Sequence, residues 1–567
     1  MSKRWAVSER PGEDGVKKLA AELNIDPVLG ELLINRGINT FDEAKYFFRP
    51  DLRHLHDPFL MADMEKAIDR IEQAIANTEK ILIYGDYDVD GTTAVALVYS
   101  FFKKHHDKIE YYIPDRYREG YGISTAGIDY AADNGFSLII ALDCGIKSVD
   151  KIAYANSRKV DFIICDHHLA GDELPEAVAV LDPKRSDCGY PYKELSGCGI
   201  GFKLIQAYAE KNDIPFEEVT SYLDLVVISI ASDIVHITGE NRVLAYFGLQ
   251  KLNSDPCVGI KALMGIAGRT GEYTISNVVF LLGPRINAAG RIDDARHAVD
   301  LLISCHEDEA NEKSALINMH NTERKGHDMT ITDEALSMID GDEVMLSRKS
   351  TVVFSENWHK GVIGIVASRL TEKYYRPTIV LTRSNGHIAG SARSVHGFDL
   401  YEALYECRDL LIQFGGHKYA AGLTLRPENI GAFADRFEEV VCATITEEQL
   451  VQEIRIDGEL ELIQVDARFF RVLNQFAPFG PGNMAPVFLS RGVKVNGYAG
   501  LAGEQHLKMA VSHAGSPTFD CIAFGLGEFL YEVNAGKAFD ICYTIEENVW
   551  RDRRSIQLNI KGIRFSD

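Results

Sequence analysis

The chain lacks the features of exported and membrane-inserted proteins. Its 567 residues contain no apolar run near the roughly 20 residues of a membrane span. The first residues carry no apolar stretch typical of a secretory signal, so we expect a cytoplasmic protein. The ten cysteines include no CxxC pair, which argues for reduced thiols and against a structural zinc site.

Positive charge is also scarce. Lys and Arg number 60 against 83 Asp and Glu, giving a formal net charge of −23 that on its face argues against a nucleic-acid partner. Two segments depart from this balance. Residues 351–425 contain eight Lys and Arg against six Asp and Glu, and residues 548–565 contain five against one. Local basic patches therefore remain compatible with an electrostatic channel for a charged polymer.

The length predicts several domains, each able to bury its own core. We expect residues 1–75 to form short helical pieces that make up an N-terminal extension. From residue 80 the pattern alternates between amphipathic segments and short β-branched runs, which predicts an α/β fold with a doubly wound parallel sheet. The expected strands are Ile81–Tyr84, Ile109–Ile113, Leu138–Leu142, Phe162–Cys165 and Ala177–Leu181.

Two further domains are expected after this one, which we place at residues 76–293. A helical connector over 294–340 leads to a second α/β domain at 341–445, with two glycine-rich turns at 389–393 and 414–417. Residues 446–567 alternate apolar and polar residues in short runs without a convincing helix, which predicts a small β-barrel.

The strongest chemical signal is a cluster of acidic residues after the first expected strand. Asp86, Asp88 and Asp90 occupy alternate positions directly after the apolar run 81–84. Like charges this close repel strongly unless a divalent cation neutralises them. A solvated acidic turn would explain them less well, because the preceding run is expected to be buried.

Two other expected strands also end in acidic residues. Asp143 follows the run 138–142, and the triplet Asp166-His167-His168 follows the run 162–165. The carboxyl ends of parallel strands meet at one edge of a sheet, where ligands bind. Oxygen and imidazole donors collected there predict a hydrolytic Mn²⁺ or Mg²⁺ site.

Two competing interpretations of the acidic cluster are weaker. An EF-hand begins with a similar D-x-D-x-D-G sequence but needs a Glu at its twelfth position, where this chain has Leu97. A haloacid-dehalogenase-type phosphatase would use Asp88 as a covalent nucleophile. It also needs paired aspartates after a strand, whereas Asp293-Asp294 follow Arg291-Ile292, and it gives His167 and His168 no role.

The ordered motifs resemble those of the DHH phosphoesterases, a family named for its Asp-His-His triplet. Asp86–Asp90, Asp143, Asp166-His167-His168 and Asp233 match its four motifs in order, and Gly415-Gly416-His417 matches the mark of its DHH-associated (DHHA1-like) domain. Two longer segments, 283–291 and 358–366, resemble those of the bacterial single-strand-specific exonucleases of the family. That resemblance covers nearly the whole chain and implies that the terminal barrel is an OB-fold.

The resemblance implies a metal-ligand set and roles for the neighbouring residues. Two divalent ions, Mn²⁺ or Mg²⁺, would be held by Asp88, Asp90, Asp143, His167 and Asp233, with Asp143 as the bridge. His168 would contact the scissile phosphate, and Asp86 and Asp166 would support the site as further catalytic residues.

Substrate-binding residues are expected outside the metal motifs. Arg285, Asn287 and Arg291 lie in a glycine-containing segment that suggests a turn close to a phosphate backbone. Arg116, just past a strand end, is expected in the same cleft, with Arg118 nearly as plausible. The 5′ phosphate would be bound by Ser391, Arg393 and Arg116. His417 and its glycines, Gly415 and Gly416, would line the cleft.

The implied function is hydrolysis of single-stranded DNA from its 5′ end to 5′-mononucleotides, in recombination, recombinational repair and mismatch repair. A groove between the two α/β domains, too narrow for duplex, would enforce single-strandedness. The barrel would hold the trailing strand by stacking and charge. The implied partners are single-stranded DNA, a single-strand-binding protein and a RecQ-type helicase, and we expect a monomer.

Three alternatives stay open at this point. A DHH phosphoesterase acting on short oligoribonucleotides or nucleotide phosphates would not need the terminal barrel. The dehalogenase-type phosphatase predicts that replacing His167 by alanine is nearly silent. A non-enzymatic DNA-binding scaffold, like the eukaryotic Cdc45 relatives, would not need the intact ligand set.

Overall fold

The computed structural model describes residues 3–513, 515–551 and 553–565. Residues 1–2 and 566–567, which belong to the predicted first and last domains, lie outside the described residues. The chain forms two compact units, which we describe separately. The larger unit contains residues 8–320 and 456–567, and the smaller unit contains residues 1–7 and 321–455.

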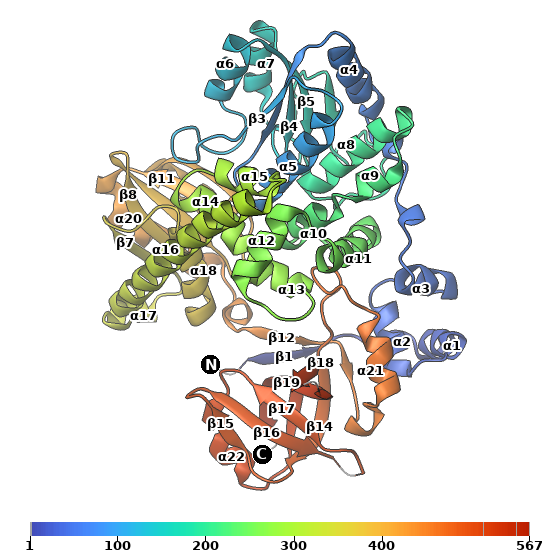
Figure 1. Ribbon diagram of the computed structural model, residues 1–567. Coiled ribbons are helices and arrows are strands. Elements are labelled where there is room, and N and C mark those ends of the chain that lie inside the picture. Colours follow the sequence, from blue (N-terminus) through green and yellow to red (C-terminus); the bar gives the residue numbers. More distant parts are fainter. Residues whose placement is uncertain (1–2, 514, 552, 566–567) are drawn as a thin grey trace. The chain divides into compact units, whose positions relative to one another are not determined.

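A five-stranded sheet organises the first part of the larger unit (Figure 1). All of its strands are parallel, in the order β3-β2-β4-β5-β6. The predicted doubly wound α/β fold is therefore confirmed, because crossover helices lie on both faces. The strands are β2 (Lys80–Gly85), β3 (Ile109–Tyr112), β4 (Phe136–Leu142), β5 (Asp161–Cys165) and β6 (Ala179–Leu181).

The two faces of this sheet bury different sets of helices. One face contributes Ile81, Ile83 and Leu138 to a core shared with α4, α5, α8 and α10. The other contributes Leu82 and Ile139 to a smaller core shared with α6 and α7. The bounds are α4 (Met64–Ala76), α5 (Val89–Lys103), α6 (Thr125–Asp133), α7 (Val149–Ser157), α8 (Gly197–Lys211) and α10 (Leu223–Ser232).

Helices fill the rest of this part of the larger unit. They are α9 (Phe216–Thr220), α11 (Gly239–Ser254), α12 (Val258–Ala267), α13 (Ile275–Asn277), α14 (Gly283–Ile292) and α15 (Arg296–Leu302), with a π-helix at Val278–Leu282. Residues 283–291, which we expected as a turn, form α14. Helix α16 (Glu307–Asp340) begins in the larger unit and ends in the smaller one. Among the described residues, no helix is both long and apolar enough to span a bilayer.

A closed β-barrel forms the C-terminal part of the larger unit, as predicted. Its strand order is β13-β14-β18-β19-β17-β16-β15, and an extra β14–β16 pairing closes the ring. The strands are β13 (Gly458–Glu459), β14 (Phe488–Val495), β15 (Gly500–Ala502), β16 (His506–Ser512), β17 (Phe519–Ala523), β18 (Phe539–Trp550) and β19 (Arg553–Phe565). Two short helices accompany them, α21 (Ala467–Asn474) and α22 (Leu530–Asn534).

The N-terminal helices α1 (Glu13–Leu23), α2 (Pro27–Ile34) and α3 (Phe41–Phe48) belong to the barrel's core. Leu29, Leu32 and Leu33 are fully buried in one cluster with Phe488 and Tyr543 of the barrel. The first helical pieces are thus part of the packing of a domain more than 400 residues away in sequence. The apolar faces of the helices predicted burial, but a single sequence does not identify the partner.

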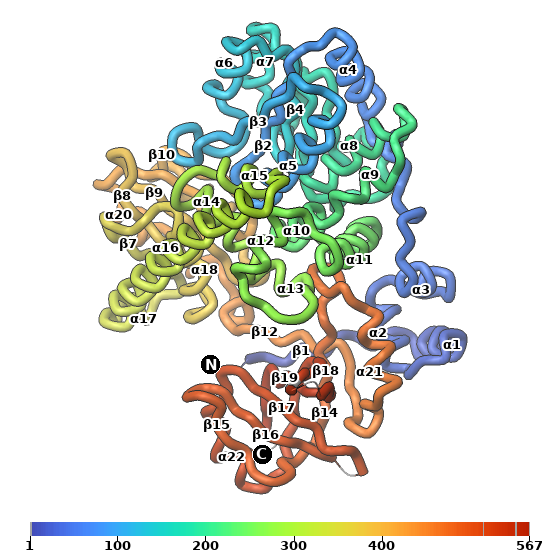
Figure 2. The backbone as a smooth tube through the Cα atoms, viewed as in Figure 1, coloured from blue at the N-terminus to red at the C-terminus, as the bar shows by residue number. Residues whose placement is uncertain are grey.

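The smaller unit contains a mixed sheet in the order β10-β11-β9-β8-β7, in which β7–β8 is the parallel pair. The strands are β7 (Thr351–Ser355), β8 (Thr378–Ser384), β9 (His387–Arg393), β10 (Leu411–His417) and β11 (Ala420–Leu425). Its helices are α17 (Glu343–Ser347), α18 (Ile363–Tyr374), α19 (Leu400–Tyr405) and α20 (Ile430–Thr444). Far apart in sequence, β1 (Arg4–Val7) pairs with β12 (Glu453–Ile456), as the tube in Figure 2 traces.

The two glycine-rich segments of the smaller unit are strands, and our expectation of turns there was wrong. Gly390 lies within β9, where a Cβ atom would come 2.6 Å from Leu381 and 2.8 Å from Leu423 on the flanking strands. Gly416 has φ 145° at the end of β10, where a Cβ atom would lie 2.3 Å from the Ala420 carbonyl oxygen. Close strand packing therefore explains these glycines.

Candidate metal centre

The first acidic motif sits where β2 passes into α5. Asp88 caps α5, and its carboxylate accepts a hydrogen bond of 3.0 Å from the Gly91 amide. Gly91 has no alternative here, because a Cβ atom would lie 2.4 Å from the Asp86 carbonyl oxygen. The buried strand and the tight helix start together hold Asp86, Asp88 and Asp90 at one point.

Asp90 is fixed by donors that sequence reasoning missed. Its carboxylate accepts hydrogen bonds from the Gly197 amide at 2.6 Å, the Cys198 amide at 2.8 Å and the Ser229 hydroxyl at 2.6 Å. The two amides belong to the first turn of α8, whose partial positive charge favours a carboxylate. The signal for this contact was the Ser-Gly-Cys-Gly start of α8, which is unremarkable without the fold.

Asp143 follows β4 in a left-handed conformation, with φ 58°. Its amide donates to the Cys165 carbonyl at 2.8 Å, which fixes this turn to the end of β5. Gly197 packs against it so closely that a Cβ atom there would lie 2.6 Å from the Asp143 Cβ. A non-glycine residue held in this region at a ligand-rich site is the kind of local strain found in functional centres.

In the Asp166-His167-His168 triplet, Asp166 makes hydrogen bonds within the loop, and the two histidines supply imidazoles. Asp166 accepts from the amides of His167 at 2.8 Å, His168 at 3.1 Å and Ile146 at 2.9 Å. Its Oδ1 also lies 2.7 Å from Nδ1 of His168. With these contacts Asp166 is the residue that orients its neighbours.

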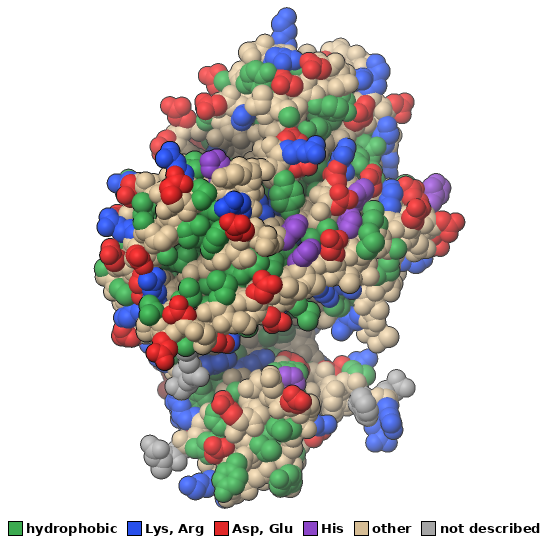
Figure 3. Space-filling model, turned by 90° about the vertical axis from the view of Figure 1, so that its left-hand side faces the viewer, with side chains coloured by type: hydrophobic (Ala, Val, Ile, Leu, Met, Phe, Trp, Pro, Cys, Tyr) green, Lys and Arg blue, Asp and Glu red, His purple; other side chains and the backbone are tan. Residues whose placement is uncertain are grey.

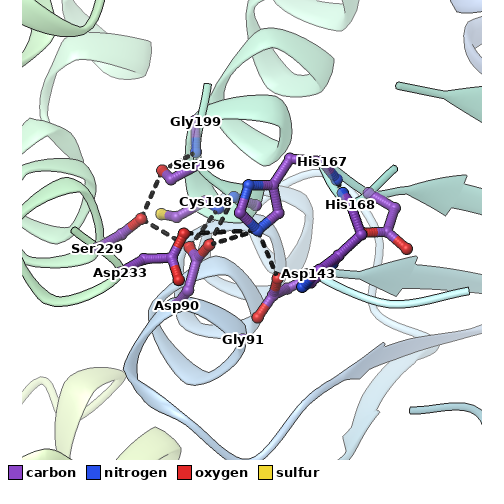
Figure 4. A network of polar contacts seen from close by, with 12 residues as sticks. Asp90, Gly91, Asp143, His167, His168, Ser196, Cys198, Gly199, Ser229 and Asp233 are labelled. Carbon is purple, nitrogen blue, oxygen red and sulfur yellow. Dashed lines mark hydrogen bonds and ion pairs between the residues drawn. The ribbon is translucent and has the colours of Figure 1, made fainter. Parts of the chain in front are cut away.

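His167 lies at the centre of the cluster (Figure 4). Its Nε2 lies 3.2 Å from Asp143 Oδ1, 3.5 Å from Asp233 Oδ2 and 3.6 Å from Asp90 Oδ2. Asp90 comes from the first turn of α5 and Asp233 from the end of α10, so two helix ends and the loops after β4 and β5 meet at one imidazole. The predicted ligands are thus brought together.

These side chains form overlapping groups with the spacing of a metal site. In each group, every residue offers one ligand atom within 4.8 Å of the others, and the groups are Asp90–His167–Asp233, Asp86–Asp88–Asp143 and Asp143–His167–His168. Both carboxylate oxygens of Asp86, Oδ1 of Asp143 and both ring nitrogens of His167 are buried without a hydrogen-bond partner in the described structure. Buried polar atoms normally have partners, so this donor set fits divalent cations.

Asp86 lies among the candidate ligand atoms. One of its oxygens groups with Asp88 and Asp143, and both oxygens are buried. The supporting role that we predicted for Asp86 stays a prediction. Asp166, by contrast, has the saturated hydrogen bonding of a supporting residue.

The pKa values of the cluster show carboxyl groups that are crowded together and buried. Burial, followed by the charges of Asp90 and Asp88, raises the pKa of Asp143 well above its usual value. Burial and the charges of Asp90 and Asp88 raise the pKa of Asp233 to about 8. Burial also lowers the pKa of His167, which keeps its imidazole neutral and able to bind a metal.

His168 has the opposite character. Burial lowers its pKa, but the hydrogen bond and charge of Asp166 outweigh this and raise the pKa of His168 to about 8. On its other side, Nε2 lies 3.3 Å from the hydroxyl of Tyr121, a half-exposed side chain that sequence reasoning missed. A protonated imidazole therefore stands at the edge of the metal centre, half exposed itself.

The predicted arginines of the larger unit lie around the first motif. The Arg116 guanidinium carbon lies 4.7 Å from the ring centroid of Tyr87, which stands between Asp86 and Asp88. This contact favours Arg116 over Arg118 as the residue beside the centre. Arg291 belongs to α14, where a Cβ atom on the preceding Gly290 would lie 2.9 Å from the Tyr87 carbonyl oxygen.

The other two predicted residues of α14 lie nearer its start. Arg285 donates to the Leu281 carbonyl at 2.6 Å and to Asn318 Oδ1 at 3.1 Å, so part of its guanidinium stabilises the helix start. Asn287 is partly exposed one turn from Arg291. The glycines of α14 let the helix pack close to the site. A Cβ atom on Gly283 would lie 2.7 Å from Ser232 Oγ, beside Asp233.

The predicted residues of the smaller unit form a surface of their own. Ser391 pairs with Gly422, which pairs with Gly415; Arg393 pairs with Ala420, which pairs with His417. Directly paired residues share a face, so Ser391, Arg393, Gly415 and His417 all lie on one face of the sheet. Gly416 occupies the alternate position.

Helix α18 begins at this surface. A Cβ atom on Gly364, in its first turn, would lie 2.9 Å from Ser391 Oγ and 3.1 Å from an Arg393 nitrogen. Gly415 and Gly422 are exposed, with at least 4.0 Å to the nearest atom that an added Cβ would meet. A helix N-terminus, a hydroxyl and a guanidinium thus border a flat glycine floor, a combination suited to phosphate.

The chain matches known families along most of its length. The DHH family N-terminal domain model matches residues 80–230, the DHHA1 domain model matches 348–443, and the RecJ OB domain model matches 456–562. Curated relatives named single-stranded-DNA-specific exonuclease RecJ include that of Bacillus subtilis, 39% identical over 100% of this chain and 71% of the relative. The Escherichia coli protein is 32% identical over 97% of each.

Solved structures give the same result. RecJ from Thermus thermophilus in complex with Mn²⁺ has a TM-score of 0.85 at 26% identity, over 100% of this chain and 80% of that one. A manganese-bound exonuclease RecJ has a TM-score of 0.61 at 29% identity, over 70% of this chain and 98% of that one. With full-length identity above 30% to several members, the chain belongs to the RecJ family of DHH phosphoesterases.

Proposed function

We propose that this chain is a metal-dependent exonuclease that hydrolyses single-stranded DNA in the 5′→3′ direction to 5′-mononucleotides. The names of its relatives support the activity and the substrate. The single observation that carries the proposal is the set of buried, unpartnered donor atoms on Asp86, Asp143 and His167. Buried polar atoms normally have hydrogen-bond partners, so a cluster of such atoms contributed by several motifs supports bound cations.

We assign two divalent ions to this centre, as Mn²⁺ or Mg²⁺; complexes of the Thermus relative with each ion support the choice. Asp90, His167 and Asp233 would hold one ion, and Asp86 and Asp88 the other, with Asp143 between them. Bound there, the ions would lower the pKa of a water molecule and neutralise charge on the phosphate under attack.

His168 is the chain's own proton-bearing group in this proposal. Its raised pKa keeps it protonated near neutral pH, so its Nε2–H can stabilise the charged phosphate or donate a proton. Asp166 acts through His168 by holding Nδ1, which fixes both the orientation and the charge of the ring. No covalent intermediate is needed.

Direction would come from recognition of the 5′ phosphate. We assign this role to Ser391 and Arg393 beside the start of α18, together with Arg116. The exposed glycines and His417 on the same sheet face would line the path of the backbone. The barrel would hold the trailing strand, with the exposed Arg553 and Arg554 of β19 as charged contacts.

The net charge does not argue against this substrate. On the face that Figure 3 presents, Lys and Arg side chains are interspersed with Asp and Glu, without a large area of one sign. We further propose action in the cytoplasm in recombination and repair, by a monomer, with single-strand-binding protein and a RecQ-type helicase as partners. We also propose domain limits at residues 1–75, 76–293, 294–340, 341–445 and 446–567.

The alternatives are less well supported. A role on short oligoribonucleotides leaves the closed barrel, matched by the RecJ OB model, without a purpose. A dehalogenase-type phosphatase needs a free Asp88 nucleophile, but Asp88 caps α5 and His167 contacts three carboxylates. A scaffold without activity would not retain every metal-motif residue.

The decisive assay uses single-stranded DNA labelled at either end, with Mn²⁺ or with chelator. We expect early release of labelled mononucleotide from the 5′-labelled strand only, and only with the metal. The Asp143→Asn variant serves as the inactive control. Release from the 3′ end first, or equal degradation of duplex DNA, would contradict the proposal.

A further inference from the structure

Ile234, the residue directly after Asp233, combines two unusual properties. Its φ is 59°, a left-handed conformation that is an outlier for a β-branched residue. Its side chain is also 65% exposed, so little packing within the described structure offsets the strain of that conformation. Glycine or asparagine would adopt the same backbone more easily.

The surrounding backbone holds Ile234 in place from both sides. Asp233 donates its amide to the Ser229 carbonyl at 2.9 Å, which ends α10. On the other side, the His236 carbonyl accepts from Tyr192 at 3.0 Å and from Asn241 at 2.9 Å. The turn is therefore set by its neighbours, and the choice of an aliphatic side chain at its tip requires a separate reason.

Its place beside the metal centre suggests that reason. Asp233 Oδ2 lies 3.5 Å from Nε2 of His167, and consecutive Cα atoms are about 3.8 Å apart. Ile234 is thus the immediate neighbour of a member of the centre, and its aliphatic side chain is exposed there. The carboxylates, the imidazoles and the ions would recognise phosphate, and Tyr121, 57% exposed beside His168, offers an aromatic ring. Ile234 adds an exposed aliphatic side chain next to Asp233.

We propose that Ile234 is a substrate-positioning residue whose side chain packs against the base of the nucleotide bound at the metal centre. This inference rests on the proposed function and deepens it. Every base has an apolar face, so a contact of this kind orients the nucleotide without selecting its sequence. That property suits an enzyme that removes any nucleotide in turn.

The test compares two substrates and three variants. The substrates are single-stranded DNA with an ordinary or an abasic 5′-terminal residue, both with Mn²⁺. Ile234→Asn removes the apolar contact while accepting the left-handed backbone, and Ile234→Val keeps both the branch and the apolar surface. Thr78→Asn is the matched control, because Thr78 is exposed with φ 56° just before β2, at the opposite end of that strand from Asp86.

We expect Ile234→Asn to lower kcat/KM on the ordinary substrate about tenfold and to leave the abasic substrate within about twofold. Ile234→Val and Thr78→Asn should stay within about twofold of wild type on both. Ile234→Asn and Thr78→Asn should each raise the thermal midpoint slightly, by about 1–2 °C, since both relieve strain.

Equal losses of Ile234→Asn on both substrates would overturn the inference, because the residue would then act through Asp233 and the ions. Unchanged activity on both would overturn it as well. A wild-type chain that releases no nucleotide with Mn²⁺ would instead refute the proposed function, and the wild-type arm reports this separately from the variant ratio.

Discussion

Two buried polar clusters of the larger unit differ in whether their polar atoms have hydrogen-bond partners. Lys203 and Glu240 are fully buried, and Lys203 Nζ donates to Glu240 at 3.0 Å and to the His56 carbonyl at 2.6 Å. Tyr190 donates to the other Glu240 oxygen at 2.7 Å. At the metal centre, by contrast, carboxylates lie close to one another and several buried atoms have no hydrogen-bond partner. The first cluster, whose buried polar groups have hydrogen-bond partners, contributes to the stability of the fold. The second, in which several buried polar atoms have no such partner, is a candidate ligand site.

The comparison predicts opposite consequences for mutation. In the closed cluster, removal of one member leaves a charge buried without its partner, so stability falls. In the open cluster, removal of a carboxylate relieves repulsion, so stability does not fall while metal chemistry is lost. Mutations in the closed cluster should therefore lower stability, and mutations in the open cluster should lower activity.

The largest expected effect is that of Asp143→Asn. Asp143 lies 3.2 Å from His167 and shares a group with Asp86 and Asp88, so its loss should lower kcat/KM by about 10³-fold or more. The metal-free variant should unfold at the same temperature as wild type or slightly higher. Steady-state release of 5′-labelled nucleotide and a thermal melt with chelator measure the two effects. A strongly destabilised variant would break the comparison.

Glu240→Leu should show the reverse. Lys203 would remain buried without its counter-ion, and we expect a loss of about 3–5 kcal/mol in the free energy of unfolding in urea. The folded fraction should retain its kcat. The double variant Lys203→Met with Glu240→Leu removes both charges and should recover most of the stability. An inactive yet stable Glu240→Leu variant would contradict the assignment of this cluster to structure.

Asp166→Asn sharpens the distinction between ligand and positioning residue. Without the carboxylate, the pKa of His168 should fall from about 8, because the hydrogen bond and charge that raise it are gone. If His168 acts while protonated, the alkaline limb of the pH–rate profile should move to lower pH, and kcat at pH 8 should fall about tenfold. A uniform loss at every pH would point to a direct metal role for Asp166.

The smallest effect concerns the pH dependence of the metal-free protein. The folded-state pKa of Asp233 is about 8, above its usual 3.8. A carboxyl with a raised pKa contributes its stabilisation fully below its unfolded pKa and loses it as pH rises through the folded pKa. Thermal midpoints measured with chelator should therefore fall between about pH 4 and pH 8. Added Mn²⁺ should oppose this fall increasingly as pH rises.

Much of this centre was predictable from the sequence because its chemistry is local to strand ends. Asp86–Asp90, Asp143 and Asp166-His167-His168 each follow an apolar run, and parallel strands bring such ends together. Asp233 was different, since an acid at a helix end is ordinary and only the family resemblance identified it. The donors that orient Asp90 come from the starts of α8 and the body of α10, contacts that no spacing in one sequence reveals.

The errors have a common cause. Glycines at 390, 416 and 283 suggested turns, but Gly390 and Gly416 permit close packing of neighbouring strands, and Gly283 permits close packing of α14 against Ser232. The association of α1–α3 with the terminal barrel was missed for the same reason, since burial is predictable and the partner is not.

The most direct test of the central claim is the stoichiometry of Mn²⁺ binding, measured by calorimetry on the chelator-stripped chain. We predict two ions per wild-type chain and loss of at least one in Asp143→Asn, while Glu240→Gln, outside the centre, still binds two. A wild-type chain that binds no Mn²⁺, or an Asp143→Asn chain that binds as wild type does, would contradict the account.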